Sequence, residues 1–351
     1  MSKKIKIGMI GGGFIGQLAH LANYVENDLC VVEALADLRP NLRERVAARF
    51  EIPLTYSSHH ELLLNPEIDA VCVVTPRQYT APTVLDCLKA NKHVLSEKPM
   101  AGNYKQASQL AAVAKEKNLT YSIGYMKRYD EGVERAKKIL DEAIQSSELG
   151  ELIYARAHCF CGDSYCNPLG HVTTDEKPTY SDRGWPMTPD WLPLELENYY
   201  HVYLNTYSHN INLLRYLVGK SPEIISSKVS RENGQVVVLD FGSFLGVLET
   251  GIASNHDWDE VAEFFFTNGR ISIHTPPALL RNFPAKVTVY KGGEIMETHN
   301  IESSWSWSFK RQADAFVDSL ITGNKTKTSG ADSLEDMRLI EEIWRMDQGL
   351  S

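Results

Sequence analysis

The chain has 351 residues, which is more than one hydrophobic core usually serves, so two domains are expected. Its hydrophobic fraction of 43% and charged fraction of 23% are those of ordinary globular proteins. The net charge of −9, with no block of Lys or Arg, excludes a nucleic-acid partner. The lack of a long apolar run or a signal peptide predicts a cytoplasmic protein without a membrane partner.

The first third of the chain alternates short apolar runs with helical patterns, as βαβ units do. Because the apolar runs are hydrophobic throughout, they are expected to form a parallel sheet covered on both faces. Residues 1–125 are therefore predicted to be an α/β domain with a doubly wound parallel sheet. The predicted strands are residues 5–10, 31–37, 69–76, 92–99 and 120–125, and the predicted helices are residues 14–26, 40–50, 81–91 and 104–118.

The pattern changes in residues 126–351. Alternating runs separated by turns predict an α+β domain with a mostly antiparallel open sheet, whose final helices can pack back on the first domain. A long irregular segment interrupts this part at residues 162–197. The predicted strands are residues 151–160, 223–231, 235–241, 244–253, 260–267, 269–275, 285–292 and 294–300, and the predicted helices are residues 131–144, 202–218, 307–323 and 333–346.

A glycine-rich turn joins the first predicted strand to the first helix. Gly11, Gly13 and Gly16 complete G-x-G-x-x-G, whose glycines allow a tight turn, close approach of a pyrophosphate and close packing of helix on strand. The start of the helix, at Phe14 and Ile15, offers backbone N–H groups to phosphates. The alternative is a glycine turn that binds nothing. The strand before the turn and the helix after it favour a Rossmann domain that binds a dinucleotide.

An acidic residue ends the second predicted strand. Asp37 follows Gly16 at about the distance expected of the acid that binds a ribose 2′-hydroxyl. A carboxylate at this place repels a 2′-phosphate, so NAD is predicted in preference to NADP. Arg39 complicates this prediction, because a guanidinium can accept the phosphate.

A second motif is more specific than the glycines. The segment KHVLSEKPMA at residues 92–101, together with DAVCVVTP at residues 69–76, resembles the glucose–fructose oxidoreductase / inositol dehydrogenase / rhizopine-catabolism (Gfo/Idh/MocA) family. The resemblance covers residues 1–125 well. In the second domain it rests mainly on the order of the elements and on one helix. It implies an NAD-dependent oxidoreductase with a Rossmann domain.

The resemblance also implies roles for particular residues. Glu97, Lys98 and Pro99 are expected beside the nicotinamide, with Lys98 as a catalytic or substrate-orienting lysine, and Thr75 and Pro76 are expected in the cofactor wall. The position of Lys98 agrees, because it follows a strand at the carboxyl edge of a parallel sheet, where ligands of such sheets bind. Its ammonium group can hold a hydroxyl and stabilise a developing alkoxide. The alternative is a surface lysine at a strand end.

The second family signature lies in the predicted helix 202–218. Asn205, His209 and Asn212 are spaced to share one helix face. The resemblance implies that His209 takes or gives the hydroxyl proton, a role that suits its intrinsic pKa, whereas the alternative is a structural histidine. The sequence departs from the family at Asn205, where Asp is common, and at Thr80, where relatives often carry His. An amide can orient a partner but cannot accept a proton.

Further candidates for substrate contact lie on either side of these motifs. Arg128 and Tyr129 correspond to a region that often reaches the substrate in the resembled family, and Arg128 can bind a carboxylate or phosphate in bidentate fashion. An ion pair at a domain interface is an equally good interpretation. Trp185 and Trp191, in the long loop 162–192, can stack on a sugar ring or simply hold the loop in place.

Three cysteines cluster in HCFCGDSYC. Cys159, Cys161 and Cys166, with His171 close behind, do not follow a standard zinc spacing. Reduced thiols in a strand and loop are the preferred interpretation, so no metal site is predicted.

Together these features predict reversible oxidation of a secondary alcohol on a sugar, cyclitol or nucleotide-linked sugar by hydride transfer to NAD. One alternative is an NAD-dependent glycosidase that oxidises a sugar transiently and eliminates its substituent, as part of the resembled family does. Another is a non-catalytic NAD-binding sensor, because fold does not dictate function. The second-domain sheet has a face that needs cover, so a homodimer or homotetramer is expected.

Overall fold

The computed structural model describes residues 4–162, 169–181, 183–252 and 257–350. The chain divides into two compact units, each built from several segments. The first unit contains residues 1–125, 168–189 and 309–337, and the second contains residues 126–167, 190–308 and 338–351. Cys166, Tyr165 and the last residue of the predicted strand 244–253 lie outside the described residues.

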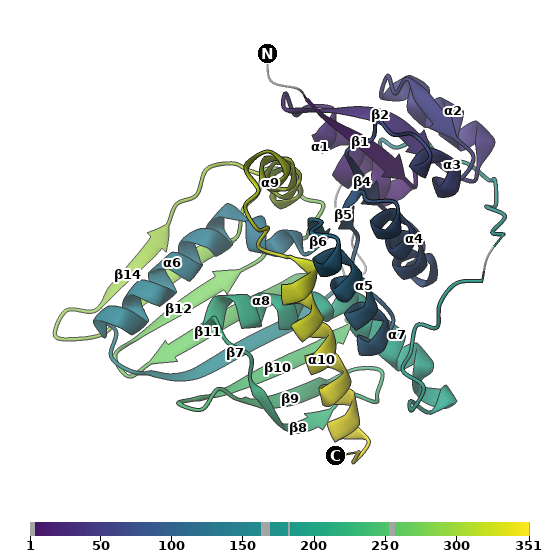
Figure 1. Cartoon of the computed structure of the whole chain (residues 1–351). Coiled ribbons are helices and arrows are strands. Elements are labelled where there is room, and N and C mark those ends of the chain that lie inside the picture. The colour runs from purple at the N-terminus through teal and green to yellow at the C-terminus, as the bar shows by residue number, and fades with distance from the viewer. Residues whose placement is uncertain (1–3, 163–168, 182, 253–256, 351) are drawn as a thin grey trace. The chain divides into compact units, whose positions relative to one another are not determined.

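A parallel six-stranded sheet forms the centre of the first unit (Figure 1). Its strand order is β3-β2-β1-β4-β5-β6, and every pair in it is parallel, which confirms the predicted doubly wound sheet. The order reverses between β1 and β4, and this switch point is where open α/β sheets bind ligands. The strands are β1 (Ile5–Ile10), β2 (Cys30–Ala36), β3 (Leu54–Tyr56), β4 (Ala70–Val73), β5 (His93–Ser96) and β6 (Tyr121–Ile123).

Helices connect these strands, and one helix from the end of the chain joins them. The apolar side of that late helix, α9, belongs to the same core as β1 and β2, through Ala313, Phe316 and Val317. The helices are η1 (Gly16–Leu21), α1 (Ala22–Tyr24), α2 (Pro40–Arg49), α3 (His59–Leu63), α4 (Arg77–Lys89), α5 (Tyr104–Glu116) and α9 (Ser308–Thr322), and α10 (Gly330–Asp347) begins in this unit.

Two local features of the first unit differ from the predictions. The predicted helix 14–26 contains the π-helix η1 before the short α1. Within it the Asn23 amide donates to the carbonyl of Ala19 at 2.7 Å, a side-chain bond that competes with the regular backbone ladder. The short β3 and α3 were not predicted, because three and five residues are too few to show a period.

An eight-stranded sheet forms the second unit. The strand order is β14-β13-β12-β11-β7-β10-β9-β8. The β7–β10 pair is parallel and the other pairs are antiparallel, so the predicted mostly antiparallel sheet is confirmed. The strands are β7 (Leu152–Cys161), β8 (Glu223–Lys228), β9 (Gln235–Asp240), β10 (Leu245–Ile252), β11 (Trp258–Phe266), β12 (Gly269–His274), β13 (Lys286–Lys291) and β14 (Glu297–Ile301).

Helices α6 and α8 pack on this sheet (Figure 1). The predicted helix 202–218 is wrong in one respect, because it is two helices that meet at Tyr207. Tyr207 has a ψ of −6°, which ends the first helical run before the second begins. The helices of this unit are η2 (Met126–Tyr129), α6 (Glu131–Ser146), η3 (Leu194–Leu196), α7 (Glu197–Thr206), α8 (Ser208–Val218) and the second part of α10.

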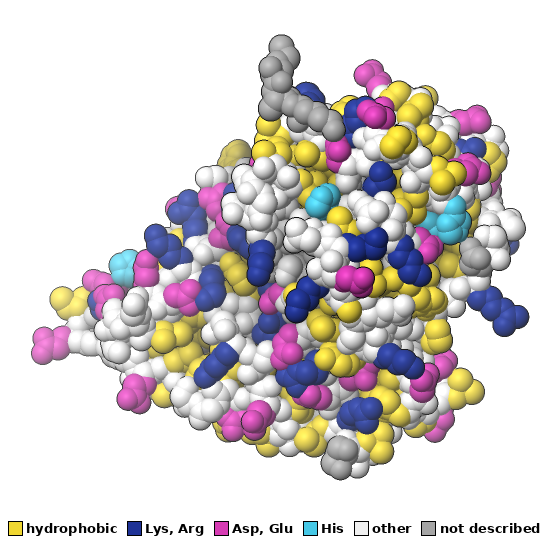
Figure 2. Space-filling model, viewed as in Figure 1, with side chains coloured by type: hydrophobic (Ala, Val, Ile, Leu, Met, Phe, Trp, Pro, Cys, Tyr) yellow, Lys and Arg dark blue, Asp and Glu magenta, His cyan; other side chains and the backbone are white. Residues whose placement is uncertain are grey.

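The surface agrees with the charge balance of the sequence. Figure 2 shows Lys and Arg side chains interspersed with Asp and Glu on the face it draws, without a broad basic area there. Among the described residues, no helix is both long enough and apolar enough to cross a membrane.

Candidate dinucleotide and substrate site

The glycine turn after β1 is shaped by close backbone contacts. Gly11 has a φ of +100°, and a Cβ atom at this residue would lie 2.1 Å from the carbonyl oxygen of Val74. A Cβ at Gly16 would lie 2.3 Å from the carbonyl oxygen of Gly11. Both glycines are therefore required by the turn itself and by the packing of η1 against it.

Gly13 differs from the other two glycines. A Cβ at Gly13 would meet no described protein atom closer than Arg39 Nη2, at 3.7 Å, so the protein alone does not require glycine there. The neighbouring Phe14 and Ile15 are half-buried at the start of the first helix. A turn that leaves this space in front of a helix start fits the pyrophosphate of a dinucleotide.

Asp37, directly after β2, is buried and accepts four hydrogen bonds. Its Oδ2 accepts from the Gly12 N–H at 2.8 Å and from Arg39 Nη2 at 2.7 Å. Its Oδ1 accepts from the Arg39 N–H at 2.9 Å and from Arg39 Nε at 2.8 Å. These bonds raise the pKa of Arg39 and fill the acceptor capacity of the carboxylate. A ribose hydroxyl can bind Asp37 only by displacing some of the Arg39 donors.

The residues that follow β4 lie at the same edge of the parallel sheet as the glycine turn, the edge formed by the carboxyl ends of its strands. The Val74 N–H donates to the carbonyl of Ile10, which places Thr75 and Pro76 beside the end of β1. The hydroxyl oxygens of Thr75 and Thr80 lie 3.1 Å apart, and Pro76 is the N-cap of α4. Thr80, where the resembled family often carries His, is buried and bonds to the Thr75 segment.

Glu97 and Lys98 follow β5 at the same edge. The Glu97 carboxylate accepts from the Lys98 N–H at 3.2 Å, and its other oxygen lies 2.8 Å from Nε2 of His20. Lys98 is half-buried and precedes Pro99 through a cis peptide bond. His20 therefore fixes the carboxylate that in turn holds the backbone of Lys98.

His20 was not predicted as a site residue. It lies on η1, and the side chains of Gln17 and Asn23, three residues away on either side, are also buried. Polar residues at helical spacing inside an otherwise apolar helix are the signal that could have identified it. Burial opposes its charged form, but Cys72 and Glu97 outweigh burial and raise the pKa of His20 to about 10.

The raised pKa gives a pH dependence that can be measured. Because the folded-state pKa lies above the ordinary value of 6.5, the stabilising contribution of His20 is fully present below pH 6.5 and is lost as the pH rises to about 10. The difference in unfolding free energy between wild type and His20→Gln is expected to shrink over that range. Chemical denaturation at several pH values measures it, with His60→Gln as an exposed control. A difference that grew with pH would contradict the assignment.

The second unit holds the predicted proton-transfer residues. Asn205 lies near the end of α7 and His209 in the first turn of α8, so they occupy two helices on either side of Tyr207 and not one continuous helix. Both side chains are half-buried. Asn212, on the following turn of α8, is only 1% exposed.

Arg128 and Tyr129, on η2, are both 2% exposed. Arg128 Nη2 donates to the carbonyl of Asn212 at 2.9 Å, and the guanidinium lies over the Tyr216 ring, 5.1 Å from its centroid. These contacts attach η2 to α8 within the second unit. A contact of Arg128 or Tyr129 with substrate stays a prediction.

The two tryptophans of the long loop belong to different units. Trp185 lies in the first unit, where its backbone N–H donates to the carbonyl of Gln78 at 2.8 Å, and the residue is half-buried. Trp191 lies in the second unit, where the guanidinium of Arg345 is 4.6 Å from its ring centroid.

A buried polar cluster that contacts α8 through Asn210 was also not predicted from the sequence. Glu260, 3% exposed, bonds to Lys127 and accepts from the Asn210 amide at 2.8 Å. The thiols of Cys159 and Cys161 lie nearby and are hydrogen-bonded to each other. This hydrogen bond lowers the pKa of Cys161 to about 7. The sequence showed these cysteines, but it did not show that β11 brings a glutamate beside them.

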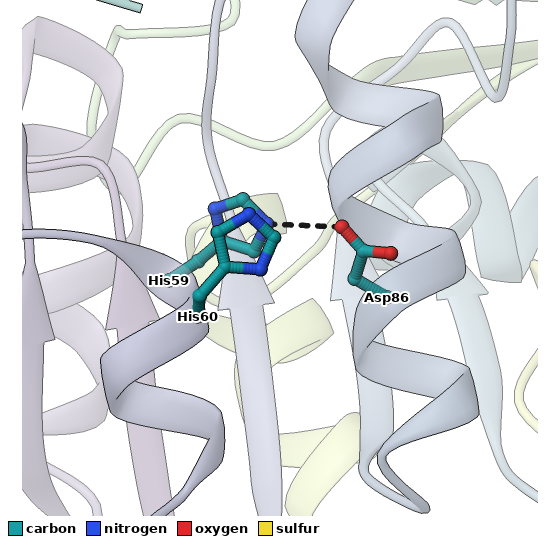
Figure 3. Close-up of side chains that lie close together, drawn as sticks. All are labelled: His59, His60 and Asp86. Carbon is teal, nitrogen blue, oxygen red and sulfur yellow. Dashed lines mark hydrogen bonds and ion pairs between the residues drawn. The ribbon is translucent and has the colours of Figure 1, made fainter. Parts of the chain in front are cut away.

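One group of possible metal ligands occurs among the described residues (Figure 3). The ligand atoms of His59, His60 and Asp86 all lie within 4.8 Å of one another. Asp86 bonds to His59 at 3.1 Å, which lowers the pKa of Asp86. This bond connects α3 to α4.

Comparisons with known proteins agree with the two-part fold. Residues 5–125 match the model of an oxidoreductase family with an NAD-binding Rossmann fold. The myo-inositol 2-dehydrogenase of Thermotoga maritima is 26% identical over 279 residues, which are 76% of this chain and 74% of that enzyme. Several other curated relatives match over only about half of their length or less, such as 52% of one and 42% of another.

Solved structures resemble the whole chain. A 3-ketoreductase from Actinomadura kijaniata, in complex with NADP and TDP-benzene, has a TM-score of 0.76 at 21% identity and covers 98% of both chains. A levoglucosan dehydrogenase, in complex with NADH and levoglucosan, has a TM-score of 0.77 at 18% identity, covering 99% of this chain and 98% of that one. At these identities the likeness establishes the two-part fold.

Proposed function

We propose that this chain is an oxidoreductase of the Gfo/Idh/MocA family and that it transfers a hydride between NAD and a secondary alcohol or ketone. The substrate class is a sugar, a cyclitol or a nucleotide-linked sugar. The first unit binds the nucleotide, and the chain from residue 126 onwards supplies most of the substrate contacts.

One observation carries this proposal. Gly13, the buried carboxylate of Asp37 and the Glu97–Lys98 pair all lie at the carboxyl ends of strands in one parallel sheet. A dinucleotide that crosses the switch point of such a sheet has its phosphates at the glycine turn and its adenosine ribose at the end of β2. Lys98 follows β5, which lies across the switch point from β2, and this is the half of the edge where the nicotinamide is expected.

The nicotinamide would supply the hydride acceptor, and side chains of this chain bind the substrate oxygen and transfer its proton. Lys98 holds the substrate oxygen and stabilises the negative charge that develops on it. His209 takes the hydroxyl proton during oxidation and returns it during reduction. Asn205 can orient the substrate or His209 by hydrogen bonds only, because an amide does not titrate. Trp185, Arg128 and Tyr129 are the further proposed substrate contacts.

NAD is the proposed cofactor. Asp37 is buried, and it would face the 2′-phosphate of NADP as a like charge. Arg39 is bound to that carboxylate on two of its nitrogens and is therefore not presented to a phosphate. The related ketoreductase structure contains NADP and the levoglucosan dehydrogenase structure contains NADH, so the choice depends on residues of this chain.

Calorimetric titration of nucleotide-free protein with NADH and NADPH tests the proposal, followed by a panel of cyclitols, anhydrosugars and nucleotide-linked sugars with NAD. We expect NADH to bind with micromolar or tighter affinity. Gly13→Ala is expected to weaken binding with little change in Tm, because the nearest protein atom to its Cβ is Arg39 Nη2 at 3.7 Å. Gly12→Ala is the matched control, because its Cβ would contact Leu35 and Asp37 at 3.6 Å and not the nucleotide, so NADH affinity is expected to change less than in Gly13→Ala. Failure of wild type to bind either nucleotide would refute the proposal.

A further inference from the structure

Residues 171–181 and 183–188, here named the crossing segment, make a series of contacts within the first unit. They follow β7 in sequence, yet they contact the loops at the carboxyl ends of the parallel strands. The contacts fall at four successive places along that edge.

The first contact is with the glycine turn. The ring of His171 meets the ring of Phe14 edge-on, with 5.0 Å between centroids. The Gln17 side-chain amide bonds the backbone of Val172 in both directions, donating to its carbonyl at 3.0 Å and accepting from its N–H at 2.7 Å. Gln17 also donates to the carbonyl of Gly12 at 2.8 Å. One buried side chain thus joins the crossing segment to the cofactor turn.

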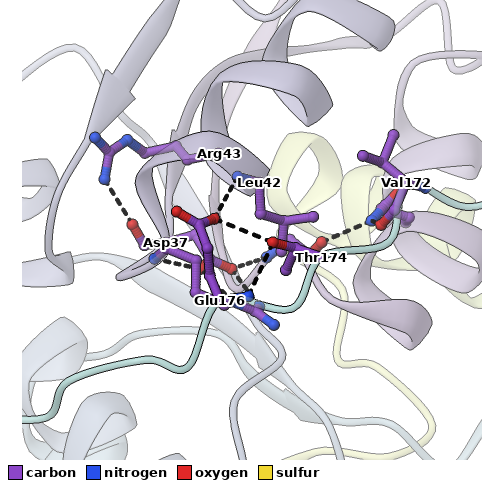
Figure 4. A network of polar contacts seen from close by, with 9 residues as sticks. Asp37, Leu42, Arg43, Val172, Thr174 and Glu176 are labelled. Atoms are coloured by element: carbon purple, nitrogen blue, oxygen red, sulfur yellow. Dashed lines mark hydrogen bonds and ion pairs between the residues drawn. The ribbon is translucent and has the colours of Figure 1, made fainter.

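The second contact is with the start of α2 (Figure 4). The N-cap of this helix, Arg39, makes no side-chain cap bond, and the first turn contains no acidic residue. Glu176 supplies both missing functions. Its carboxylate accepts from the N–H of Asn41 at 3.1 Å and from the N–H of Leu42 at 2.9 Å, and it places a negative charge at the positive end of the helix.

The third contact is with the start of α4. Tyr180 stacks on Tyr79, with 3.7 Å between ring centroids and 5° between planes. Asp37 and Arg39 are close enough to affect the pKa of Tyr180, which burial raises. Five residues later, the backbone N–H of Trp185 donates to the carbonyl of Gln78. The aromatic pair therefore lies within electrostatic range of the carboxylate that is proposed to bind the ribose.

The fourth contact is with the start of α5. Gln106 donates to the carbonyl of Pro186 at 2.9 Å, and the Asn103 amide donates to the carbonyl of Thr188 at 3.2 Å. A Cβ at Gly102 would lie 2.3 Å from the Pro186 carbonyl oxygen, so the two backbones are packed directly together.

The crossing segment thus spans the carboxyl edge from β1 and β2 to β4 and β5, which is where a dinucleotide lies in this fold. We infer that it is the outer wall of the dinucleotide groove and that the nucleotide leaves only when this wall detaches. The inference rests on the proposed function. It predicts that contacts remote from the nucleotide, such as the Glu176 cap of α2, control how fast the nucleotide is released.

The rate of NADH release tests the inference. The NADH complex is mixed with excess NAD, and the loss of bound-NADH fluorescence is followed in wild type, Glu176→Ala and Tyr180→Ala. Each variant loses one contact of the wall, so release is expected to accelerate by about tenfold or more. Asp175→Ala is the matched control, because Asp175 is the exposed acidic neighbour of Glu176, and its release rate is expected to equal that of wild type.

The outcomes separate this inference from the proposed function. If wild type binds NADH and both variants release it at the wild-type rate, the wall has no control over exchange and the inference is overturned alone. If only Glu176→Ala accelerates release, the effect belongs to the stability of α2, and the inference is again overturned. If wild type binds no nucleotide, both the inference and the proposed function fall. Thermal unfolding of each variant establishes that it is folded.

Discussion

Replacing Lys98 with alanine is expected to lower kcat by about 10²- to 10³-fold, the usual effect of removing one donor to a developing oxyanion. Binding of NADH is expected to persist, because the glycine turn and Asp37 are separate from this side chain. Steady-state kinetics on the sugar that the substrate panel identifies, together with calorimetry for NADH, would separate the two effects.

Lys89→Ala is the matched control, because Lys89 is an exposed lysine at the end of α4. Lys98→Arg tests geometry, because it keeps the positive charge but presents a planar group in place of an ammonium. Full activity in Lys98→Ala would remove this residue from the mechanism and leave the negative charge on the substrate oxygen without its proposed stabilising group.

Replacing Asp37 with alanine is expected to reverse the nucleotide preference. The change removes the acceptor for a ribose hydroxyl, removes a like charge beside a 2′-phosphate, and releases the guanidinium of Arg39 from its two bonds. Loss of one charged hydrogen bond and gain of another, at about 1.5 to 3 kcal/mol each, corresponds to about a 100-fold or larger change in the ratio of the NADH and NADPH Kd values. Calorimetric titration with both nucleotides measures this ratio.

Arg39→Ala supplies the opposite test. Because Arg39→Ala removes the donors that compete for the Asp37 carboxylate, NADH affinity is expected to rise or hold. NADPH affinity is expected to fall, because the Asp37 charge that faces a 2′-phosphate is then no longer neutralised by Arg39. An unchanged ratio in both variants would mean that the adenosine ribose does not lie at the end of β2. Circular dichroism is a necessary control for Asp37→Ala, because the carboxylate also holds the N–H of Gly12.

Much of the first unit could be predicted because its signals are local. The glycine spacing at Gly11 and Gly16 reflects backbone contacts within one turn, and an apolar run such as 69–76 has the composition of a buried strand whatever its partners are. The Glu97–Lys98 pair was identified by a resemblance to a family and not by its geometry.

The features that were missed depend on partners far away in sequence. Glu176 and Leu42 are 134 residues apart, and His20 and Glu97 are 77 residues apart. No periodicity or composition relates such residues, so the crossing segment could be predicted only as a long loop with a possible binding role. The sequence puts Arg39 two residues after Asp37, but it does not show that the guanidinium bonds to that carboxylate.

The contribution of α9 to the core of the first unit has a consequence for how the protein is made. Residues 1–125 are synthesised before the second sheet, but Ala313, Phe316 and Val317 complete the core beside β1 and β2 only after the strands of that second sheet have been translated. The nascent nucleotide-binding sheet must wait with that apolar surface uncovered while the whole second sheet is translated. Exposed surface of this kind leads to aggregation and is what chaperones hold. The nucleotide-binding unit is begun before the second sheet and completed only after it.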